Sequence, residues 1–154
     1  MTVSSSRYEA KASGEEYSDE SKDVASGEIA KLGYIVTRTE LVSDEKRMIQ
    51  MELKKFISGQ EDVLVFMGGT GLSRRDITIE TVRPFFEKEI EGFGELLRLV
   101  GEKKIGAATY LSRATAGVAK GKLILCLPGS PGAAKDALRA FGKEIPHALF
   151  VARS

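Results

Sequence analysis

Residues 63–71 have the sequence Val-Leu-Val-Phe-Met-Gly-Gly-Thr-Gly, in which five consecutive apolar residues are followed by three glycines within four positions. A strand that is apolar at every position is typical of a parallel sheet covered by helices on both faces. Residues 123–127, Leu-Ile-Leu-Cys-Leu, show the same pattern and are followed by a proline and a glycine. These two runs predict the centre of a sheet in an α/β fold.

Stretches of helical periodicity alternate with these strands. Apolar residues recur at helical spacing over about 19–32 and again between the polar cluster 43–45 and Ser58-Gly59. Further helical stretches are expected over 78–86 and 93–100 and from about Ala133, and residues 111–118 and 122–127 are expected to pair as an antiparallel hairpin. The predicted architecture is one domain over residues 1–154, a three-layer α/β/α sandwich with a mixed, mostly parallel sheet.

Three further segments complete the predicted topology. Residues 34–39 are mixed in character and predict a strand nearer an edge of the sheet, and residues 148–151 predict a final short strand. Residues 8–18 are polar and lack a sustained period, so we expect a long mobile loop there.

The composition excludes several classes of function. The 23 basic and 22 acidic side chains nearly cancel, so neither nucleic acid nor an anionic membrane is expected as a partner. No apolar run approaches the roughly 20 residues of a spanning helix, and the N-terminal residues lack the features of a signal peptide, so a cytoplasmic protein is expected. The single cysteine, Cys126, lies within an apolar run and is expected to be a buried, unreactive thiol.

The residues that follow the apolar strands are the candidates for ligand binding, because open α/β sheets bind ligands beyond the carboxyl ends of their strands. Glycines let the backbone approach a ligand and present N–H groups to an anion. The glycine-rich loop after residue 67 matches neither the Walker loop nor the dinucleotide fingerprint. If this loop binds a ligand, the ligand could be a mononucleotide or a pterin phosphate. The alternative is that the loop is only a tight turn between a strand and a helix. The candidate residues are Gly68, Gly69, Thr70 and Gly71, with charge added by Arg74 and Arg75.

A second loop, Pro128-Gly129-Ser130-Pro131-Gly132, follows the other apolar strand and leads into a predicted helix. A hydroxyl and free N–H groups at a helix N-terminus can bind an anion or the edge of a pterin. The alternative is that proline and glycine merely end the strand.

Two aspartates, one after Leu41-Val42 and one at the end of the glycine-rich loop, are expected at the same edge from separate loops. Asp44 and Asp76 could supply the carboxylate oxygens that Mg²⁺ prefers, as a metal-assisted nucleotidyl transfer requires. Each aspartate could instead cap the helix that comes after it.

Several segments, taken in order, resemble the family of molybdopterin-binding proteins that includes MoaB, MogA and the G domain of gephyrin. They are Met67-Gly68-Gly69-Thr70-Gly71 with Asp76 five residues later, Glu89 to Glu95, Ser112-Arg113-Ala114 and Leu127 to Gly132. The resemblance covers essentially the whole chain. It implies a three-layer α/β/α fold and an enzyme that uses ATP and Mg²⁺ to adenylylate molybdopterin, with release of pyrophosphate, for a molybdenum or tungsten cofactor.

The resemblance also implies roles for individual residues. Gly68, Gly69, Thr70 and Gly71 would cradle phosphate, Asp44 and Asp76 would be the catalytic and metal-binding carboxylates, and Gly129, Ser130, Pro131 and Ser4 would line the ligand. Many members have an aspartate where this chain has Ser5, for which Asp19 is a partial substitute. Members also usually carry more residues ahead of Thr2, so we expect the first strand to be shortened at the N-terminus.

The resemblance further implies a trimer or a hexamer of trimers, which exposed apolar residues such as Phe93 and Leu97 would favour, and the molybdenum-insertion protein of the same pathway as a partner. Two other functions stay open. One is a non-catalytic molybdopterin-binding or assembly protein of the same fold. The other is a nucleotide-processing enzyme like the competence-damage proteins, which share a related domain.

Overall fold

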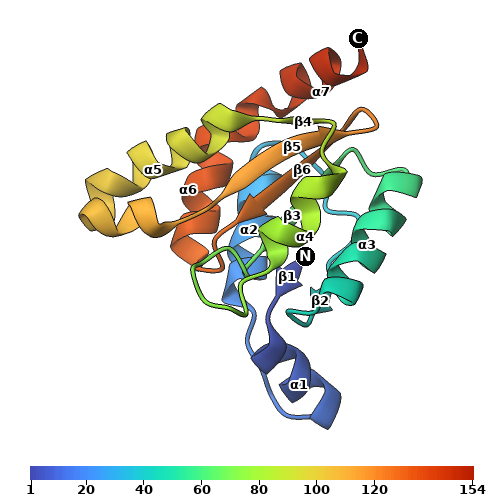
Figure 1. Cartoon of the computed structure of the whole chain (residues 1–154), viewed down its shortest axis with the longest axis vertical. Helices are drawn as coiled ribbons and strands as arrows, with labels where there is room; N and C mark the ends of the chain where they lie inside the picture. Colours follow the sequence, from blue (N-terminus) through green and yellow to red (C-terminus); the bar gives the residue numbers. More distant parts are fainter.

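Six strands form one mixed sheet in the computed structural model, which describes residues 1–154 (Figure 1). The strand order is β2-β1-β3-β6-β5-β4. Strands β2, β1, β3 and β6 are parallel, whereas β5 is antiparallel to β6 and β4 is antiparallel to β5. The strands are β1 Thr2–Val3, β2 Leu41–Val42, β3 Val63–Met67, β4 Lys88–Glu89, β5 Thr115–Ala119 and β6 Lys122–Leu127. The predicted mixed, mostly parallel sheet is confirmed, with its two apolar runs at the centre.

Helices cover both faces of this sheet, as the three-layer prediction requires (Figure 1). The core divides into two clusters because successive strand residues point to opposite faces. Phe66 and Ile124 pack with the helices of one face, and Met67 and Leu125 pack with those of the other. The first face carries α3 Lys46–Ser58 and α4 Thr78–Val82, and the second carries α2 Glu20–Lys31, α5 Glu91–Ile105 and α6 Pro131–Phe141. None of the helices combines the length and the hydropathy needed to cross a membrane.

The pairing of β3 with β6 sets the level at which the candidate loops begin. Met67 lies beside Leu127, so the glycine loop and the proline–glycine loop leave the sheet at the same height. Cys126 is fully buried on β6, and burial raises the pKa of its thiol to about 12. The predicted buried, unreactive thiol agrees with this environment.

The mobile loop predicted over residues 8–18 is wrong for its first part, because α1 spans Ser5–Ser13. The hydroxyl of Ser4 accepts from the N–H of Arg7 (3.4 Å) and caps the helix. Gly14 ends it in the left-handed conformation, at φ 77°, with its N–H directed to the carbonyls of the last turn. No residue of α1 is buried, so the helix has no apolar stripe from which its period could be predicted.

The strand predicted over residues 34–39 does not form. Strand β2 begins only at Leu41, and its one neighbour, β1, pairs with it through two residues. Residues 34–39 therefore have no strand beside them, and Ile35 is 87% exposed. A β-prone segment becomes a strand only where a partner supplies its hydrogen bonds.

The final strand predicted over residues 148–151 is also wrong, because these residues belong to α7 Ile145–Arg153. A short apolar run does not distinguish a strand from a helix by its periodicity. Pro146 lies in the first turn of α7, where proline is well tolerated in a helix.

Phe93, predicted to be exposed, is also placed differently. It is 1% exposed and packs edge-on against Phe141, with ring centroids 5.1 Å apart. Leu97 is partly buried against the same cluster. The helical period of α5 marks its core face, and Phe93 and Leu97 lie on that face rather than on the side open to a partner.

Candidate functional site

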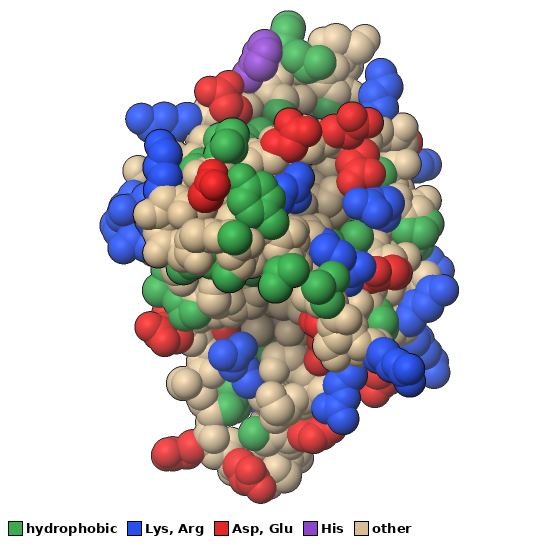
Figure 2. Space-filling view, turned by 60° about the vertical axis from the view of Figure 1, so that its left-hand side comes forward, with side chains coloured by type: hydrophobic (Ala, Val, Ile, Leu, Met, Phe, Trp, Pro, Cys, Tyr) green, Lys and Arg blue, Asp and Glu red, His purple; other side chains and the backbone are tan.

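The four parallel strands all end at one edge of the sheet, and the candidate residues follow directly. Ser4 comes after β1, Asp44 after β2, and the glycine loop after β3. The loop beginning at Pro128 comes after β6. The space-filling view shows a hollow between the lower lobe, which α1 forms, and the body of the molecule, with basic side chains near its rim (Figure 2).

The glycine loop packs closely against Val3 and Thr78 and has N–H groups without a hydrogen-bond partner. Gly68 and Gly69 have φ of 108° and 64°, a region that side chains rarely tolerate. A Cβ on Gly68 would lie 2.3 Å from the carbonyl oxygen of Val3, and one on Gly69 would lie 2.2 Å from Oγ1 of Thr78. Thr78 holds the loop by donating from its hydroxyl to the carbonyl of Gly68 (2.8 Å) and from its N–H to that of Gly69 (3.0 Å).

Three successive N–H groups of this loop have no hydrogen-bond acceptor within the chain. The N–H of Gly68 donates to the carbonyl of Leu127 (3.0 Å), but those of Gly69, Thr70 and Gly71 donate to no group of the protein. Successive free amides of this kind form an anion-binding concavity. Thr70 is buried as a whole residue, at 4% exposed, whereas Gly69 and Gly71 on either side are half-buried.

The second loop lies directly against the first. A Cβ on Gly129 would be 3.2 Å from the Cα of Gly68. The carbonyl of Gly129 accepts from the hydroxyl of Ser21 on α2 (2.6 Å), which fixes the loop from the other side. Ser130 caps α6, its Oγ accepting from the N–H of Ala133 (3.3 Å), and Pro131 is the first residue of that helix. The N-terminus of α6, which is the positive end of its helix dipole, therefore lies at this edge of the sheet.

Asp44 has a different role from the helix cap that its position suggested. The N-terminal cap of α3 is Glu45, without a side-chain bond. Oδ2 of Asp44 accepts from the N–H of Ser5 (2.8 Å), and the N–H of Asp44 donates to the hydroxyl of Ser5 (3.0 Å). Oδ1 of Asp44 lies 3.3 Å from the position of a Cβ on Gly69. The carboxylate therefore borders the glycine loop.

Asp76 is not a helix cap either. The cap of α4 is Ile77, and Oδ2 of Asp76 accepts from the N–H of Ser73 (2.8 Å) within its own loop. This oxygen lies 2.9 Å from the position of a Cβ on Gly71. The glycine loop therefore has Asp44 beside its second residue and Asp76 beside its fourth.

Each of the two carboxylates has one oxygen without a hydrogen bond. Oδ1 of Asp44 and Oδ1 of Asp76 accept no hydrogen bond from the chain. No group of three or more His, Cys, Asp or Glu side chains is gathered where it could hold a metal. Mg²⁺ commonly binds one or two carboxylates and keeps several waters or substrate oxygens, so each of these oxygens is of the type that this ion takes as a ligand.

The remaining candidates lie around this centre. Arg74 and Arg75 are exposed on the loop after Gly71. Asp19, the expected substitute for an aspartate at position 5, is buried and caps α2, accepting from the N–H of Lys22 (3.1 Å). Ser5 itself contacts Asp44, so position 5 reaches the centre through a hydrogen bond.

Arg113 also reaches this edge, and no role for it was predicted. It lies just before β5, and because β5 is antiparallel to β6, the start of β5 meets the carboxyl end of β6. The rule that ligand-binding residues follow parallel strands does not include such a position. The residues that precede an antiparallel strand meet the same edge, and this second rule would have found Arg113.

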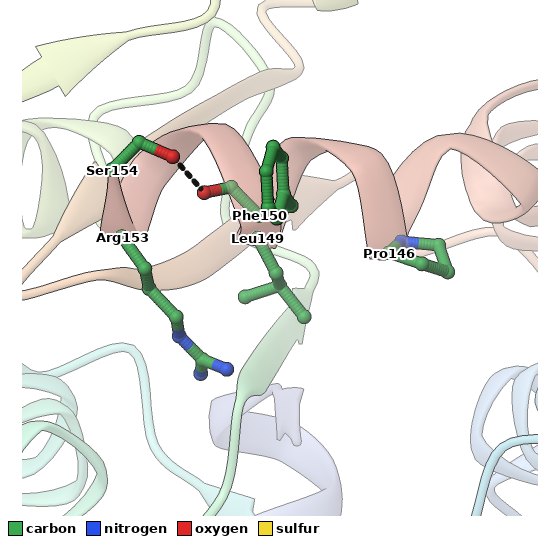
Figure 3. A pocket seen from close by; sticks show the side chains of 5 residues that line it. All are labelled: Pro146, Leu149, Phe150, Arg153 and Ser154. Carbon is green, nitrogen blue, oxygen red and sulfur yellow. Dashed lines mark hydrogen bonds between the residues drawn. The ribbon is translucent and has the colours of Figure 1, made fainter.

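A separate pocket of about 470 Å³ lies along α7, at the opposite end of the molecule from α1 (Figures 1 and 3). Its one charged side chain, Arg153, is paired with Asp62 and donates to the carbonyl of Gly121 (3.0 Å). The hydroxyl of Ser154 donates to the carbonyl of Phe150 (2.8 Å; Figure 3). The lining residues are Pro146, Leu149, Phe150, Arg153 and Ser154. This pocket offers no free group for catalysis.

A glycine loop with free amides and a helix N-terminus at the carboxyl edge of a parallel sheet are the features with which many α/β proteins bind phosphorylated ligands. A family described as "Probable molybdopterin binding domain" matches residues 1–147. The chain belongs to this molybdopterin-binding domain family.

Individual relatives agree with this membership. The chain is 46% identical over 111 residues to "Molybdenum cofactor biosynthesis protein B" of Staphylococcus aureus, a match that covers 71% of this chain and 66%, just under two thirds, of that protein. It is 40% identical over 142 residues to "Molybdopterin adenylyltransferase" of Pyrococcus furiosus, covering 90% of this chain and 83% of that one. The crystal structure of the molybdopterin biosynthesis enzyme MoaB from Thermus thermophilus superposes with a TM-score of 0.87 at 36% identity, covering 99% of this chain and 92% of that one.

Proposed function

We propose that this protein transfers the adenylyl group of ATP to molybdopterin in a Mg²⁺-dependent reaction that releases pyrophosphate, a step in the biosynthesis of the molybdenum or tungsten cofactor. The observation that carries the proposal is the pair Asp44 and Asp76, which border the same glycine loop, each with a free carboxylate oxygen. The name of the relative from Pyrococcus furiosus supports the same reaction.

The reaction asks the protein for positioning and for charge stabilisation. An oxygen of the terminal phosphate of molybdopterin attacks the α-phosphorus of ATP and forms a new P–O bond, and the bond to the bridging oxygen of the β-phosphate breaks. Pyrophosphate leaves with that electron pair. Negative charge grows on the phosphate oxygens, and fixed N–H donors stabilise it without reorganising. The amides of Gly69, Thr70 and Gly71, which have no acceptor within the chain, would supply such donors.

The residues around the loop would share the binding of the two substrates. Asp44 and Asp76 would hold Mg²⁺ through Oδ1, and the ion would offset the charge of the phosphates when bound. The loop at Gly129, Ser130 and Pro131, at the positive end of α6, would receive a second anionic or polar edge of the ligand. Ser4, at the carboxyl end of β1, would line the same space.

The test is incubation of the protein with molybdopterin, ATP and MgCl₂, with detection of adenylylated molybdopterin by mass spectrometry and of pyrophosphate. We expect both products in equal amounts, and neither product without molybdopterin. A protein that only binds molybdopterin would take up the pterin and release no pyrophosphate. That result would replace the enzyme by a binding or assembly protein of the same fold.

We also infer a trimer or a hexamer of trimers. Buried Phe93 gives no support, but four large apolar side chains on α5 and η2 (Gly106–Leu111) are more than half exposed, namely Leu99, Ile105, Tyr110 and Leu111. Exposed apolar side chains on adjoining elements favour contact between subunits. Light scattering at micromolar concentration checks this inference, and a monomer mass would contradict it.

For the same reaction we propose a cytoplasmic location and the molybdenum-insertion protein as a partner, because that protein would consume the adenylylated product.

A further inference from the structure

The segment from Gly71 to Asp76 leaves the sheet as an excursion between β3 and α4. Four consecutive residues of it, 72–75, are exposed. Within the excursion, the N–H of Asp76 donates to the carbonyl of Ser73 (3.0 Å), and the N–H of Arg75 donates to the hydroxyl of Ser73 (3.2 Å). Such local bonds define the tip of a loop, and Thr78 holds the residues before it, Gly68 and Gly69. Neither set of bonds fixes the excursion itself to the rest of the fold.

Arg113 provides that fixation from outside the loop. Its Nε donates to the carbonyl of Gly71 (2.8 Å), and its Nη2 donates to the carbonyl of Asp76 (3.1 Å). No other side chain from outside residues 68–78 hydrogen-bonds to the excursion. One guanidinium therefore joins the first and the last residue of the excursion.

Arg113 is held in turn by α4. Its Nη1 pairs with Oε1 of Glu80, and its Nη2 lies 3.4 Å from Oε2 of the same residue. The hydrogen bond from Arg113 is the main reason that the pKa of Glu80 lies below its ordinary value. The side chain of Arg113 is 32% exposed, and all three of its nitrogens are used. A planar fork of donors suits this task, whereas the ammonium of lysine is a point charge that cannot span the same acceptors.

We propose that Arg113 is a positioning residue for the proposed adenylyl transfer. It closes the excursion from Gly71 to Asp76 and so places the Asp76 carboxylate beside the glycine loop. The inference rests on the proposed function. Arg113 need not touch a substrate. Arg113 would act on the rate by fixing the position of Asp76, because a displacement of about 1 Å of a group in an active site can reduce the rate by roughly 10²-fold.

The test compares Arg113→Lys with Arg139→Lys as a matched control. Arg139 also uses its fork on neighbouring acceptors, with Nε and Nη2 donating to Glu28 at 2.8 and 3.1 Å, but it joins α2 to α6. A second variant, Glu80→Gln, keeps Arg113 and removes its ion pair, and position 80 is exposed enough (52% of the side chain) that folding should persist. The readouts are amide hydrogen exchange of residues 72–76, Tm, and kcat and KM for ATP.

For Arg113→Lys we expect exchange at residues 72–76 to be at least about tenfold faster, because the excursion opens more often. We expect kcat to fall by roughly 10- to 100-fold, while KM for ATP stays within about threefold. Glu80→Gln should show a smaller change in the same direction, and Arg139→Lys should leave both the exchange of this segment and kcat unchanged.

Unchanged exchange at residues 72–76 in Arg113→Lys would overturn the inference, whatever the activity. Faster exchange with parental kcat would overturn the positioning role as well. A loss of kcat matched by Arg139→Lys would show that general stability is responsible. Absence of turnover in the parent protein would overturn the proposed function itself. This failure can be told apart from failure of the inference on Arg113, because hydrogen exchange is measured without turnover.

Discussion

The backbone N–H of Ser5 donates to the carboxylate of Asp44 at 2.8 Å, and the N–H of Asp44 donates back to the hydroxyl of Ser5 at 3.0 Å. The same hydroxyl lies 2.9 Å from that of Ser43. This reciprocal pair joins the start of α1, which follows β1, to the loop after β2. The position of Asp44 beside the glycine loop is therefore set by two strands that are 39 residues apart in the chain.

Replacement of either aspartate by asparagine separates its charge from its hydrogen bond. The amide oxygen of asparagine still accepts from Ser5 or from Ser73, so Asp44→Asn and Asp76→Asn should change Tm little. Loss of a carboxylate that holds Mg²⁺ should lower adenylylation by about 10²-fold or more and raise the Mg²⁺ requirement. We expect Asp76→Asn to be the more damaging, because Asp76 lies on the glycine loop itself. Parental turnover and Mg²⁺ dependence in both variants would contradict a catalytic role.

Gly69 should not tolerate even a methyl group. Its φ is 64°, and a Cβ would lie 2.2 Å from Oγ1 of Thr78, which is fully buried. Gly69→Ala should therefore lower the free energy of unfolding by about 2–4 kcal/mol, from backbone strain and overpacking together. Denaturant titration measures this change.

Gly27 is the matched control for that substitution. It lies within α2, and a Cβ there would meet nothing within 4 Å. Gly27→Ala should stabilise the protein by about 0.5–1 kcal/mol. Equal effects of the two substitutions would show that the space around Gly69 is not restrictive.

The sequence predicts the centre of this fold better than its periphery. Strands β3 and β6 could be predicted because a parallel strand with both faces covered must be apolar throughout. Helix α1 buries no residue, so its helix-forming residues and caps are the only signals for it. The segment 34–39 depends on a neighbouring strand for its hydrogen bonds, and this dependence is not visible in its own residues.

The candidate site divides in the same way. The glycine loop could be predicted because three glycines after a buried strand are a local pattern. The partners of the aspartates could not be predicted, since local pattern favoured helix caps while Asp44 bonds to Ser5 across the sheet edge. Arg113 was missed because it precedes the antiparallel strand β5, whereas the sequence was read for residues that follow parallel strands. Its acceptors, the carbonyls of Gly71 and Asp76, are visible only in the structure.

Glu28 should make stability depend on pH in the acid range. On α2, it accepts from Arg139 of α6 and from Lys31, and these bonds, Arg139 first, lower the pKa of its carboxyl from 4.5 to about 2. A folded-state pKa below the unfolded one means that the carboxylate stabilises the fold above about pH 4.5, and that this contribution is lost as the pH falls toward 2.

Glu28→Gln should therefore lower Tm at neutral pH, and the difference from the parent protein should shrink between pH 4.5 and 2. Glu95 is an exposed glutamate of α5 outside the ion pairs of the chain, so Glu95→Gln is the control and should leave Tm unchanged. Thermal melts across this pH range provide the measurement. A difference between Glu28→Gln and the parent that stayed constant with pH would contradict the assigned ion pairs.

The most direct test of the proposed reaction follows the fate of each phosphate of ATP. ATP labelled at the α-phosphate and ATP labelled at the γ-phosphate are supplied in separate reactions with molybdopterin, Mg²⁺ and the protein. Adenylyl transfer predicts that the α-label appears in the pterin product and the γ-label in pyrophosphate. A γ-label in the pterin would indicate phosphoryl transfer, and retention of both labels in ATP with molybdopterin bound would indicate a binding protein; either result would contradict the proposal.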